Sequence, residues 1–380
     1  MKQKRILVTS TDVMMLQFLV PHVFFLRENG FTVDVACSNV EGHIEELEAL
    51  FAGKVDFEVI GSVRSPLSPK NVKGYRQLKK KINAGHYDLI WTNEPVMGVL
   101  TRLAARKARK KGTKVLYVAH GFHFYQGAPK KKWLLYYPIE KMLSRATDRL
   151  ITINREDTKF AETHFQRCKP EYFHGIGINT EKFRRESIDT FQKREELNIP
   201  SDAKLYLSVA ELEKRKNHET VIRAFAQANL PNSYLLICGL GTQREVLESL
   251  IETLGMSERV RLLGYRYDIR ELLETADVFV LGSYQEGLSV AIMEAMAMQK
   301  LCVVSKIRGN TDLIDGTNGI LFDPKQVDSV KAALELAYRE PEKYEASRMA
   351  NPEKLKAYDF EVIRVQMLNT IRNLIGMDAV

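Results

Sequence analysis

The 380-residue sequence contains only four cysteines, and no two of them have a CxxC spacing. Three of the four lie in or beside apolar runs that are typical of strands. This pattern argues against a disulfide framework and against a zinc site, so we expect buried thiols in a reducing compartment. The four residues are Cys37, Cys168, Cys238 and Cys302.

Long apolar stretches are also missing. No run reaches the ~20 residues that a membrane-spanning helix needs. The strand-like segment 5–9 begins with no signal peptide before it. We therefore expect a cytoplasmic protein whose membrane contact is peripheral, at the inner face of the cell membrane.

Motifs for metal binding are absent too. The sequence has no Asp-x-Asp and no His/Cys/Asp cluster with metal-ligand spacing. A Mg²⁺ or Mn²⁺ clamp on a diphosphate is therefore not expected, and cations of the chain would have to take its place. No residue stands out as a covalent nucleophile, and no cofactor is expected.

Acidic residues are scarce in two long stretches of the first half. Residues 59–87 contain seven Lys or Arg and no acid, and residues 95–139 contain ten and no acid. The net charge of +8 consists of +12 up to Gly175 and −4 after it. A basic first half suggests an anionic partner such as a phosphate, a nucleic acid or a membrane surface.

Short β-branched runs alternate with segments of helical period along the chain, which predicts βαβ units and parallel sheets. The length suits two domains, at roughly 100–200 residues each. We expect strands at 4–9, 31–37, 57–61, 87–92, 114–119 and 148–153, then at 204–209, 234–238, 260–263, 278–281 and 302–305. We expect helices near 14–29, 71–83, 95–111, 155–165 and 360–375.

The predicted fold class is α/β, with two Rossmann-like, doubly wound domains. The glycine-punctuated stretch 173–179 marks the linker, so the domains are placed at 1–175 and 176–358, with a terminal helix at about 359–380. Such sheets bind ligands at the carboxyl ends of their strands. We expect these ends to face one another across a cleft.

The segment 283–297 follows a buried strand and opens into a helix. Backbone N–H groups at a helix N-terminus suit a phosphate. Glu286 before this helix and Glu294 within it could flank one ligand, since a carboxylate can accept two hydrogen bonds from a vicinal diol. The alternative is an acid that complements the helix dipole, plus a surface Glu. The candidate amides belong to Gly287, Leu288, Ser289 and Val290.

The run from Glu286 to Glu294 resembles the E-x7-E signature of retaining glycosyltransferases of family 4, which have the GT-B architecture of two Rossmann domains. Five other motifs are similar to that family in the same order. One of them, Gly175 to Phe183, resembles the linker element that opens the family's donor domain. Two of them, 120–124 and 307–314, resemble members that build capsular and exopolysaccharide repeat units. The remaining two are Gly239-Leu240-Gly241 and the segment 262–266, which includes Arg266, beside the nucleotide base.

The resemblance implies that an Arg and a Lys five positions apart hold the donor diphosphate. Lys216 matches the Lys, but Glu211 stands at the Arg position. Lys214 or Arg215 could supply the missing cation, or Glu211 could pair with it; a solvated basic turn is the alternative. The family also places His120 in the donor-sugar pocket. Candidates on the acceptor side are Asp12, Asn93, Glu94 and His123, although the family's glycines after the first strand are absent here.

The function implied is transfer of a hexose or N-acetylhexosamine, with retention, from a nucleotide-diphosphate sugar to a polyprenyl-diphosphate-linked saccharide. UDP is expected from its frequency in the family. Lysines 130–132 precede the aromatic run 133–137, a composition that suits an anionic membrane surface, unless these rings pack into the core. Alternatives are a sugar-nucleotide epimerase, or a nucleic-acid-binding protein, for which no known module is evident.

Overall fold

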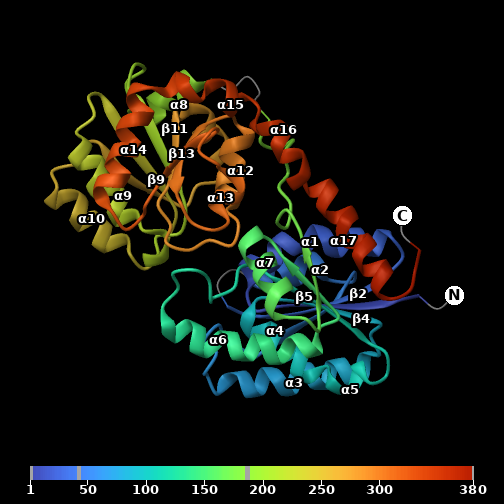
Figure 1. Ribbon diagram of the computed structural model, residues 1–380. Coiled ribbons are helices and arrows are strands. Elements are labelled where there is room, and N and C mark those ends of the chain that lie inside the picture. Colours follow the sequence, from blue (N-terminus) through green and yellow to red (C-terminus); the bar gives the residue numbers. More distant parts are fainter. Residues whose placement is uncertain (1–2, 41–43, 185–188, 379–380) are drawn as a thin grey trace. The chain divides into compact units, whose positions relative to one another are not determined.

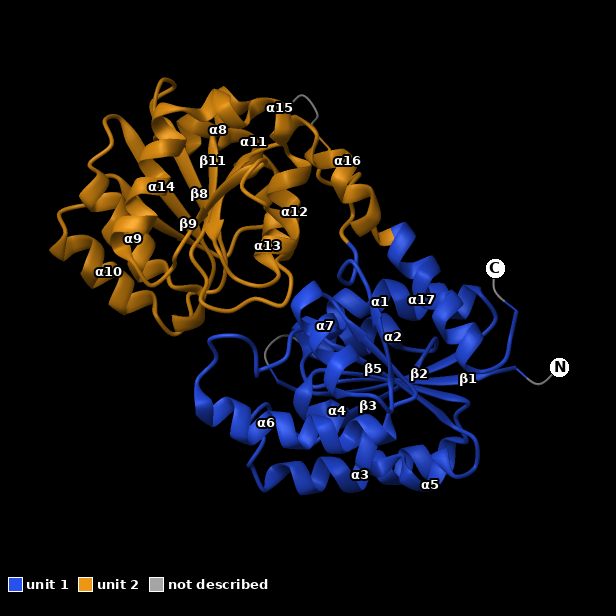
Figure 2. Cartoon of the chain, viewed as in Figure 1, with its two compact units in different colours: residues 1–177, 361–380 blue, residues 178–360 orange. Residues whose placement is uncertain are grey.

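The computed structural model describes residues 3–40, 44–184 and 189–378, and the chain forms two compact units (Figures 1 and 2). Unit 1 consists of residues 1–177 and 361–380, and unit 2 consists of residues 178–360. The boundary expected from the sequence, after residue 175, lies two residues before the first crossing between the units.

Among the described residues, unit 1 holds a seven-stranded parallel sheet with the order β3-β2-β1-β4-β5-β6-β7. The chain moves outward from β1 in one direction and then returns to the other side of β1 with β4. This order confirms the doubly wound topology. The strands are β1 (Arg5–Ser10), β2 (Thr32–Ser38), β3 (Asp56–Ile60), β4 (Leu89–Asn93), β5 (Lys114–Ala119), β6 (Arg149–Thr152) and β7 (Lys169–Tyr172).

Helices cover both faces of this sheet, because the strands of a parallel sheet are apolar on both sides. In Figure 1, α3, α4 and α6 lie on one face, whereas α1, α2 and α17 lie on the other. The helices are α1 (Val13–Glu28), α2 (Ile44–Phe51), α3 (Lys70–Gly85), α4 (Pro95–Ala104), α5 (Arg106–Arg109), α6 (Lys130–Leu143), α7 (Arg155–His164) and α17 (Phe360–Leu374).

The last helix, α17, packs on unit 1 although unit 2 precedes it in the sequence (Figure 2). Ile363, Met367 and Ile371 are buried and recur every four residues, so they share one face of the helix. The guanidinium carbon of Arg364 lies 4.4 Å from the centre of the Phe25 ring on α1. The last helix thus completes the apolar cover of the first sheet.

Unit 2 contains, within the described residues, a six-stranded parallel sheet with the order β10-β9-β8-β11-β12-β13. The direction of winding reverses between β8 and β11, as it does between β1 and β4 in unit 1. The strands are β8 (Lys204–Val209), β9 (Ser233–Cys238), β10 (Val260–Gly264), β11 (Val278–Leu281), β12 (Leu301–Ser305) and β13 (Gly319–Phe322).

Successive residues of β8 contribute to two separate apolar layers. Leu205 and Leu207 pack in a layer with α12, while Tyr206 packs in a layer with α9 and α14. This alternation follows from the two-residue period of a strand. The helices are α8 (Thr190–Glu196), α9 (His218–Ala228), α10 (Arg244–Thr253), α11 (Ile269–Thr275), α12 (Val290–Ala297), α13 (Asn310–Leu313), α14 (Val327–Arg339), α15 (Glu345–Met349) and α16 (Asn351–Leu355).

The structure adds elements that the sequence patterns did not predict. The edge strand β7 reads Lys-Pro-Glu-Tyr, and its proline and charges conceal it. Strand β13, an edge strand of the sheet in unit 2, has only four residues. The single helix expected at 95–111 is wrong, because α4 and α5 are separated at Ala105 and α5 ends at Arg109. Helices α2 and α6 were also not predicted.

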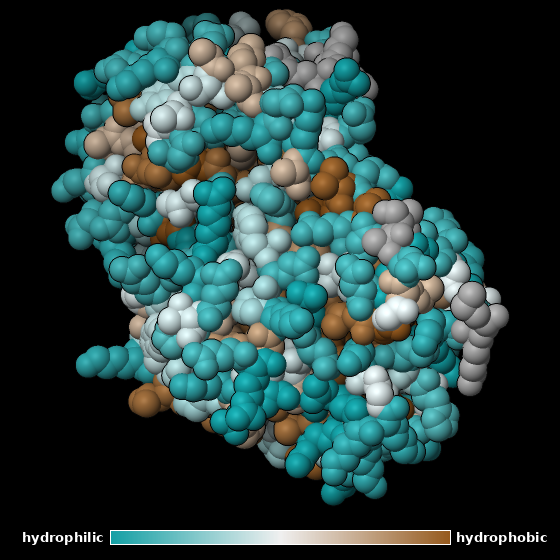
Figure 3. Space-filling view, turned by 45° about the vertical axis from the view of Figure 1, so that its right-hand side comes forward, coloured by the Kyte–Doolittle hydropathy of each residue, from teal (hydrophilic) through white to brown (hydrophobic). Residues whose placement is uncertain are grey.

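The surface drawn in Figure 3 is mostly hydrophilic, and its hydrophobic residues form separate patches. Within the described part of the chain, no helix combines the length and the apolar character needed to cross a membrane. All four cysteines are buried and unbridged.

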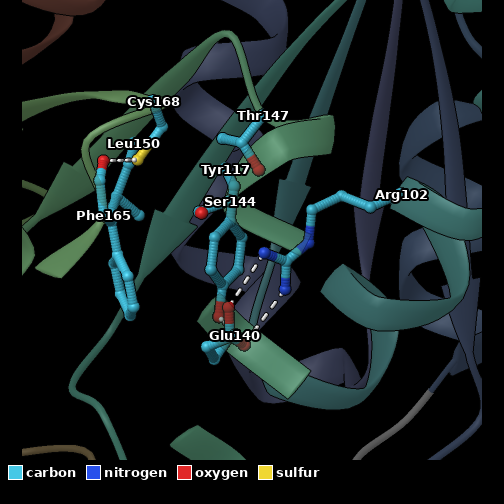
Figure 4. Close-up of a pocket in the computed structure, with 8 residues that line it drawn as sticks. All are labelled: Arg102, Tyr117, Glu140, Ser144, Thr147, Leu150, Phe165 and Cys168. Atoms are coloured by element: carbon cyan, nitrogen blue, oxygen red, sulfur yellow. Dashed lines mark hydrogen bonds and ion pairs between the residues drawn. The ribbon is translucent and has the colours of Figure 1, made fainter. Parts of the chain in front are cut away.

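A buried cluster of charges joins α6 to α4 (Figure 4). Nη1 of Arg102 donates to Oε2 of Glu140 at 2.8 Å, and Nη2 donates to Oε1 at 3.0 Å. Both side chains are almost fully buried, with exposures of 1% and 6%. The Arg102 guanidinium also lies over the Tyr117 ring, 4.0 Å from its centre, and Tyr117 Oη donates to Glu140. Arg102 therefore anchors α6 and is not a surface cation.

We predict that Glu140→Ala lowers the free energy of unfolding of unit 1 by about 3–5 kcal/mol, because it leaves the Arg102 charge buried without its carboxylate. Both tryptophans, Trp91 and Trp133, lie in unit 1, so tryptophan emission in urea follows this unit. The double variant Arg102→Met/Glu140→Leu should recover most of the loss. Lys110→Ala, at an exposed position directly after α5, serves as a control. Equal loss in the single and double variants would contradict the prediction.

Candidate functional site

The winding of the second sheet reverses between β8 and β11, and loops after these strands leave the same edge of the sheet. Ligands of doubly wound proteins bind outside the carboxyl ends of the strands at such a point. Residues 210–217 follow β8, and residues 282–289 follow β11. The basic motif and the E-x7-E motif, far apart in the sequence, therefore become neighbours.

An ion pair joins these two loops. Lys216 Nζ donates to Oε1 of Glu286 at 2.7 Å, and Ser283 Oγ donates to the same oxygen at 2.6 Å. The side chains of Lys216 and Glu286 are 14% and 8% exposed. A backbone hydrogen bond from Tyr284 N to Arg215 O, at 2.8 Å, holds the loops together beside the pair. The ammonium and the carboxylate are thus positioned together before any ligand binds.

The two glycines after β9 allow another loop to approach the first one closely. Gly239 and Gly241 have φ values of +151° and +158°. A Cβ atom at these positions would lie 2.0 Å from Ala210 O and 2.5 Å from Leu212 O. The Gly-x-Gly motif therefore packs against the loop that carries Lys216. Its contact with a ligand remains a prediction.

Gly309, in the segment 307–314, brings a further loop to the same edge. A Cβ atom on Gly309 would lie 2.3 Å from Gly287 O, so the two backbones are in direct contact. The motif after β12 thereby supports the Glu286 loop from the side.

Helix α12 begins directly after that loop. Ser289 caps it by accepting a hydrogen bond from Ile292 N. Of the four predicted amides, that of Val290 lies in the first turn, and those of Gly287, Leu288 and Ser289 directly precede it. Glu294 lies on this helix and is partly buried. Burial raises the pKa of Glu294 to about 7, although the positive charge of Lys182 lowers it in part. Lys182 was not predicted as a site residue, although it lies within the motif Gly175 to Phe183.

The remaining cations predicted for this site have different surroundings. Arg215 forms an ion pair with Glu211, the residue at the position where the family has Arg. Arg266 donates to Asp268 at 2.7 Å and to Glu196 at 2.9 Å, so two carboxylates hold its guanidinium. Lys214 is exposed.

In unit 1 the winding reverses between β1 and β4, and polar residues gather at that edge. Asn93 ends β4, and its Nδ2 donates to Thr9 O at 3.1 Å. Its Oδ1 therefore accepts from Nε2 of His120, 3.0 Å away at the end of β5. Burial lowers the pKa of His120 to about 4, so the ring is neutral at pH 7 and its Nδ1 carries a lone pair.

Glu94, immediately after β4, turns back toward the end of β1. Its Oε2 accepts hydrogen bonds from Ser10 Oγ at 2.8 Å and from Thr11 N at 2.5 Å. Burial and the neighbouring carboxyl of Asp12 raise the pKa of Glu94 well above its usual value. Glu94 also has a positive φ of 63°, a backbone conformation that non-glycine residues seldom adopt.

Asp12 is buried and satisfied on both oxygens. It caps α1 by accepting from Met15 N at 2.6 Å, and it pairs with Arg64 at 2.8 Å. Burial alone would raise the pKa of Asp12, but the hydrogen bonds from Glu94, Met15 and Arg64 lower it below its usual value. Arg64 was missed as a member of this group, because its basic stretch was interpreted as surface.

His123 is in contact with an aromatic ring. Its ring stacks on Tyr136 of α6, with ring centres 4.5 Å apart. The described contacts link two acceptor-side candidates, Asp12 and Glu94, to each other, and they link Asn93 to His120, the residue expected in the donor-sugar pocket. Among the described residues, no three His, Cys, Asp or Glu side chains are placed to hold a metal ion.

Two family matches divide the chain in the same way as the two sheets. Residues 189–354 match the family described as glycosyl transferases group 1, and residues 7–154 match glycosyl transferase 4-like. EpsD of Bacillus subtilis, a protein assigned as a glycosyltransferase, is 39% identical over 90% of this chain and 89% of its own length. A further relative is the UDP-Gal:alpha-D-GlcNAc-diphosphoundecaprenol alpha-1,3-galactosyltransferase of Escherichia coli, 30% identical over 70% of both chains.

Solved structures share the architecture. Sucrose-phosphate synthase from Thermosynechococcus elongatus has a TM-score of 0.80 at 18% identity and covers 98% of this chain and 100% of its own. HepE of Anabaena, in complex with UDP and glucose, has a TM-score of 0.77 at 18% identity with the same coverage. At this identity the likeness shows a common fold of two Rossmann-like domains.

Proposed function

This chain belongs to the group 1 glycosyltransferases, and from that premise we propose that it transfers a hexose or N-acetylhexosamine from a nucleotide-diphosphate sugar to a polyprenyl-diphosphate-linked saccharide. The family match confirms the resemblance to family 4 and the enzyme class, so the epimerase and nucleic-acid alternatives are set aside. Retention of configuration, UDP as the nucleotide and a place in capsule or exopolysaccharide synthesis are parts of the proposal.

The observation that carries the proposal is the Lys216–Glu286 pair at the switch point of unit 2, beside the first turn of α12. A diphosphate needs a cation and backbone amides, and a sugar ring needs hydroxyl acceptors. In the proposed complex, Lys216 and the amides of 287–290 bind the diphosphate. Glu286 orients the sugar, and Glu294 accepts hydrogen bonds from the ribose hydroxyls.

In the proposed reaction the bond between the anomeric carbon and the β-phosphate oxygen breaks. The acceptor hydroxyl forms its bond on the same face of the sugar, and its proton passes to a donor phosphate oxygen. The leaving diphosphate gains negative charge as the bond breaks. Lys216 and the helix amides, already positioned, stabilise this charge, which is the main catalytic contribution assigned to the chain.

We assign the acceptor side to unit 1. His120, which the resemblance places in the donor-sugar pocket, has a neutral ring oriented by Asn93, and its Nδ1 can accept a hydrogen bond from a hydroxyl of the transferred sugar. At the neighbouring strand ends, the carboxyl group of Glu94 is the further hydroxyl partner, and Asp12, whose oxygens both have partners, holds Glu94 and Arg64 in position. A polyprenyl-diphosphate acceptor matches what the name of the Escherichia coli relative describes for that protein.

Membrane contact through α6 is the second part of the proposal, in a form corrected by the structure. The aromatic residues do not form an outward belt, because Trp133 packs on Phe124 and Phe160, with ring centres 5.6 and 5.7 Å apart. Leu134 is 78% exposed, and Lys130 and Lys131 beside it are exposed. These three side chains provide the cations and the apolar contact that an anionic lipid surface requires.

We expect Lys216→Ala to lower kcat by about a hundredfold to a thousandfold at saturating donor, because a preorganised cation stabilises the charge of the leaving group. The measurement is release of nucleoside diphosphate from UDP-sugars, first by hydrolysis and then with a lipid-linked acceptor. Lys331→Ala on α14 serves as the matched control. An unchanged kcat in Lys216→Ala would contradict the assignment.

The donor KM should rise about tenfold between pH 8 and pH 6, because Glu294, with a pKa of about 7, loses the charged form that accepts hydroxyl hydrogen bonds. The KM rises as the pH falls because the ionised form of Glu294 is the form that binds the donor. A nucleotide sugar is the suitable ligand, since its diphosphate does not titrate in this range. Glu294→Gln should abolish the pH dependence, and Glu258→Gln should retain it. A pH dependence that survives in Glu294→Gln would assign it to another group.

Replacement of Lys130, Lys131 and Leu134 by Ser should weaken binding to phosphatidylglycerol vesicles by about 30-fold or more, since each lysine near an anionic surface contributes ~1 kcal/mol. Binding to phosphatidylcholine vesicles should be weak for all variants. The matched control replaces Lys343, Met349 and Lys354 of unit 2 by Ser. Equal co-sedimentation of the α6 variant and the wild-type protein would exclude α6 as the contact.

A further inference from the structure

The charges at the switch point of unit 2 leave the proposed diphosphate short of cations. Lys216 is matched by Glu286, and Arg215 is matched by Glu211. The third cation of this loop, Lys214, is offset by a third carboxylate, Glu213, which accepts hydrogen bonds from Thr242 N and Oγ1 at 3.0 and 2.9 Å. The three cations and three carboxylates therefore carry no net charge. A ligand with at least two negative charges needs one of the two ion pairs to open.

The two pairs differ in how firmly they are held. Lys216 and Glu286 are mostly buried, and Ser283 adds a hydrogen bond to the same carboxylate oxygen. Arg215 and Glu211 are about half exposed, at 48% and 45%. Half-exposed ion pairs contribute little net stability, because water solvates the separated charges well. The Arg215–Glu211 pair is therefore the one that opens at low cost.

We propose that Arg215 is the second cation for the donor diphosphate, and that Glu211 holds its guanidinium in a resting position from which the diphosphate draws it away. This inference rests on the proposed function, because it assumes a nucleotide-diphosphate donor in unit 2. The planar guanidinium can donate two parallel hydrogen bonds to phosphate oxygens. A diphosphate carries more negative charge than the single carboxylate of Glu211, so it attracts the guanidinium more strongly.

The backbone of Arg215 is placed for this purpose. Its carbonyl accepts a hydrogen bond from Tyr284 N at 2.8 Å, two residues before Glu286. Lys216 follows Arg215 directly and reaches Glu286. The Arg215 side chain therefore starts from a backbone that is hydrogen-bonded to the Glu286 loop.

A hydrogen bond from His218 holds the backbone of Glu211 in place. Burial lowers the pKa of His218 to about 4, so its ring is neutral at pH 7, and Nε2 donates to Glu211 O at 3.1 Å. The carboxylate therefore extends from a constant point, and the resting position of Arg215 is defined. Arg266 is a weaker candidate for the second cation, since two carboxylates hold it.

The test is calorimetric binding of nucleotides to the full-length protein. UDP, GDP and ADP are titrated first, and the best ligand is then compared with its own monophosphate. Arg215→Ala should weaken diphosphate binding about tenfold to a hundredfold while monophosphate binding changes little. Glu211→Gln should tighten diphosphate binding several-fold, because the competing carboxylate is gone.

A matched control is available on α9, where Arg223 pairs with Glu219 at the same four-residue spacing and with similar exposure, 43% and 54%. Arg223→Ala and Glu219→Gln should leave the diphosphate-to-monophosphate preference unchanged. A merely structural role of Arg215 would lower the thermal unfolding temperature without changing that preference.

Two negative outcomes are distinguishable. If the wild-type protein binds a nucleoside diphosphate and Arg215→Ala keeps the same preference over the monophosphate, the inference about Arg215 is wrong and the proposed function stands. If Glu211→Gln weakens diphosphate binding, the resting-position role of Glu211 is wrong. If the wild-type protein binds none of the three diphosphates, the proposed donor itself is overturned.

Discussion

A charged side chain that leaves water needs a partner of opposite charge, because the cost of an unpaired buried charge is several kcal/mol. At the reversal of winding in unit 2, this constraint couples Lys216 to Glu286 and so couples the loop after β8 to the loop after β11. Gly239 and Gly309 then bring the neighbouring loops into backbone contact with these two. The local architecture of the proposed donor site follows from one ion pair and the close packing around it.

The same constraint acts in unit 1 with a different result. Arg102 and Glu140 are buried as a complete pair, so they hold α6 against the sheet. At the edge of the sheet, hydrogen bonds from Glu94, from Met15 N and from Arg64 lower the pKa of Asp12, whereas burial raises the pKa of Glu94. One carboxyl thus remains ionised beside another that binds its proton more tightly. Such an arrangement both donates and accepts hydrogen bonds, which suits hydroxyl groups more than phosphates.

The sequence predicted the elements of both sheets well where apolar periodicity was strong, and it failed where physical context decides. Strand β7, with its lysine, proline and glutamate, is stable only as an edge next to β6. The contact of Lys216 with Glu286 depends on β8 lying beside β11, a sheet order that local patterns do not encode. Trp133 has the sequence context of a membrane anchor, yet neighbouring phenylalanines bury much of its ring.

The net charge of a segment also does not show which of its cations can bind a ligand. The first half of the chain has the larger positive charge, but Arg102 is used inside the core and Arg64 stabilises Asp12. In unit 2, a net negative segment, the decisive property of a cation is how easily it leaves its carboxylate. A buried pair such as Lys216–Glu286 provides a fixed geometry, whereas a half-exposed pair such as Arg215–Glu211 provides a cation that can move. Binding a diphosphate and releasing it after transfer requires both kinds, because a fully preorganised set of charges would hold the product as firmly as the transition state.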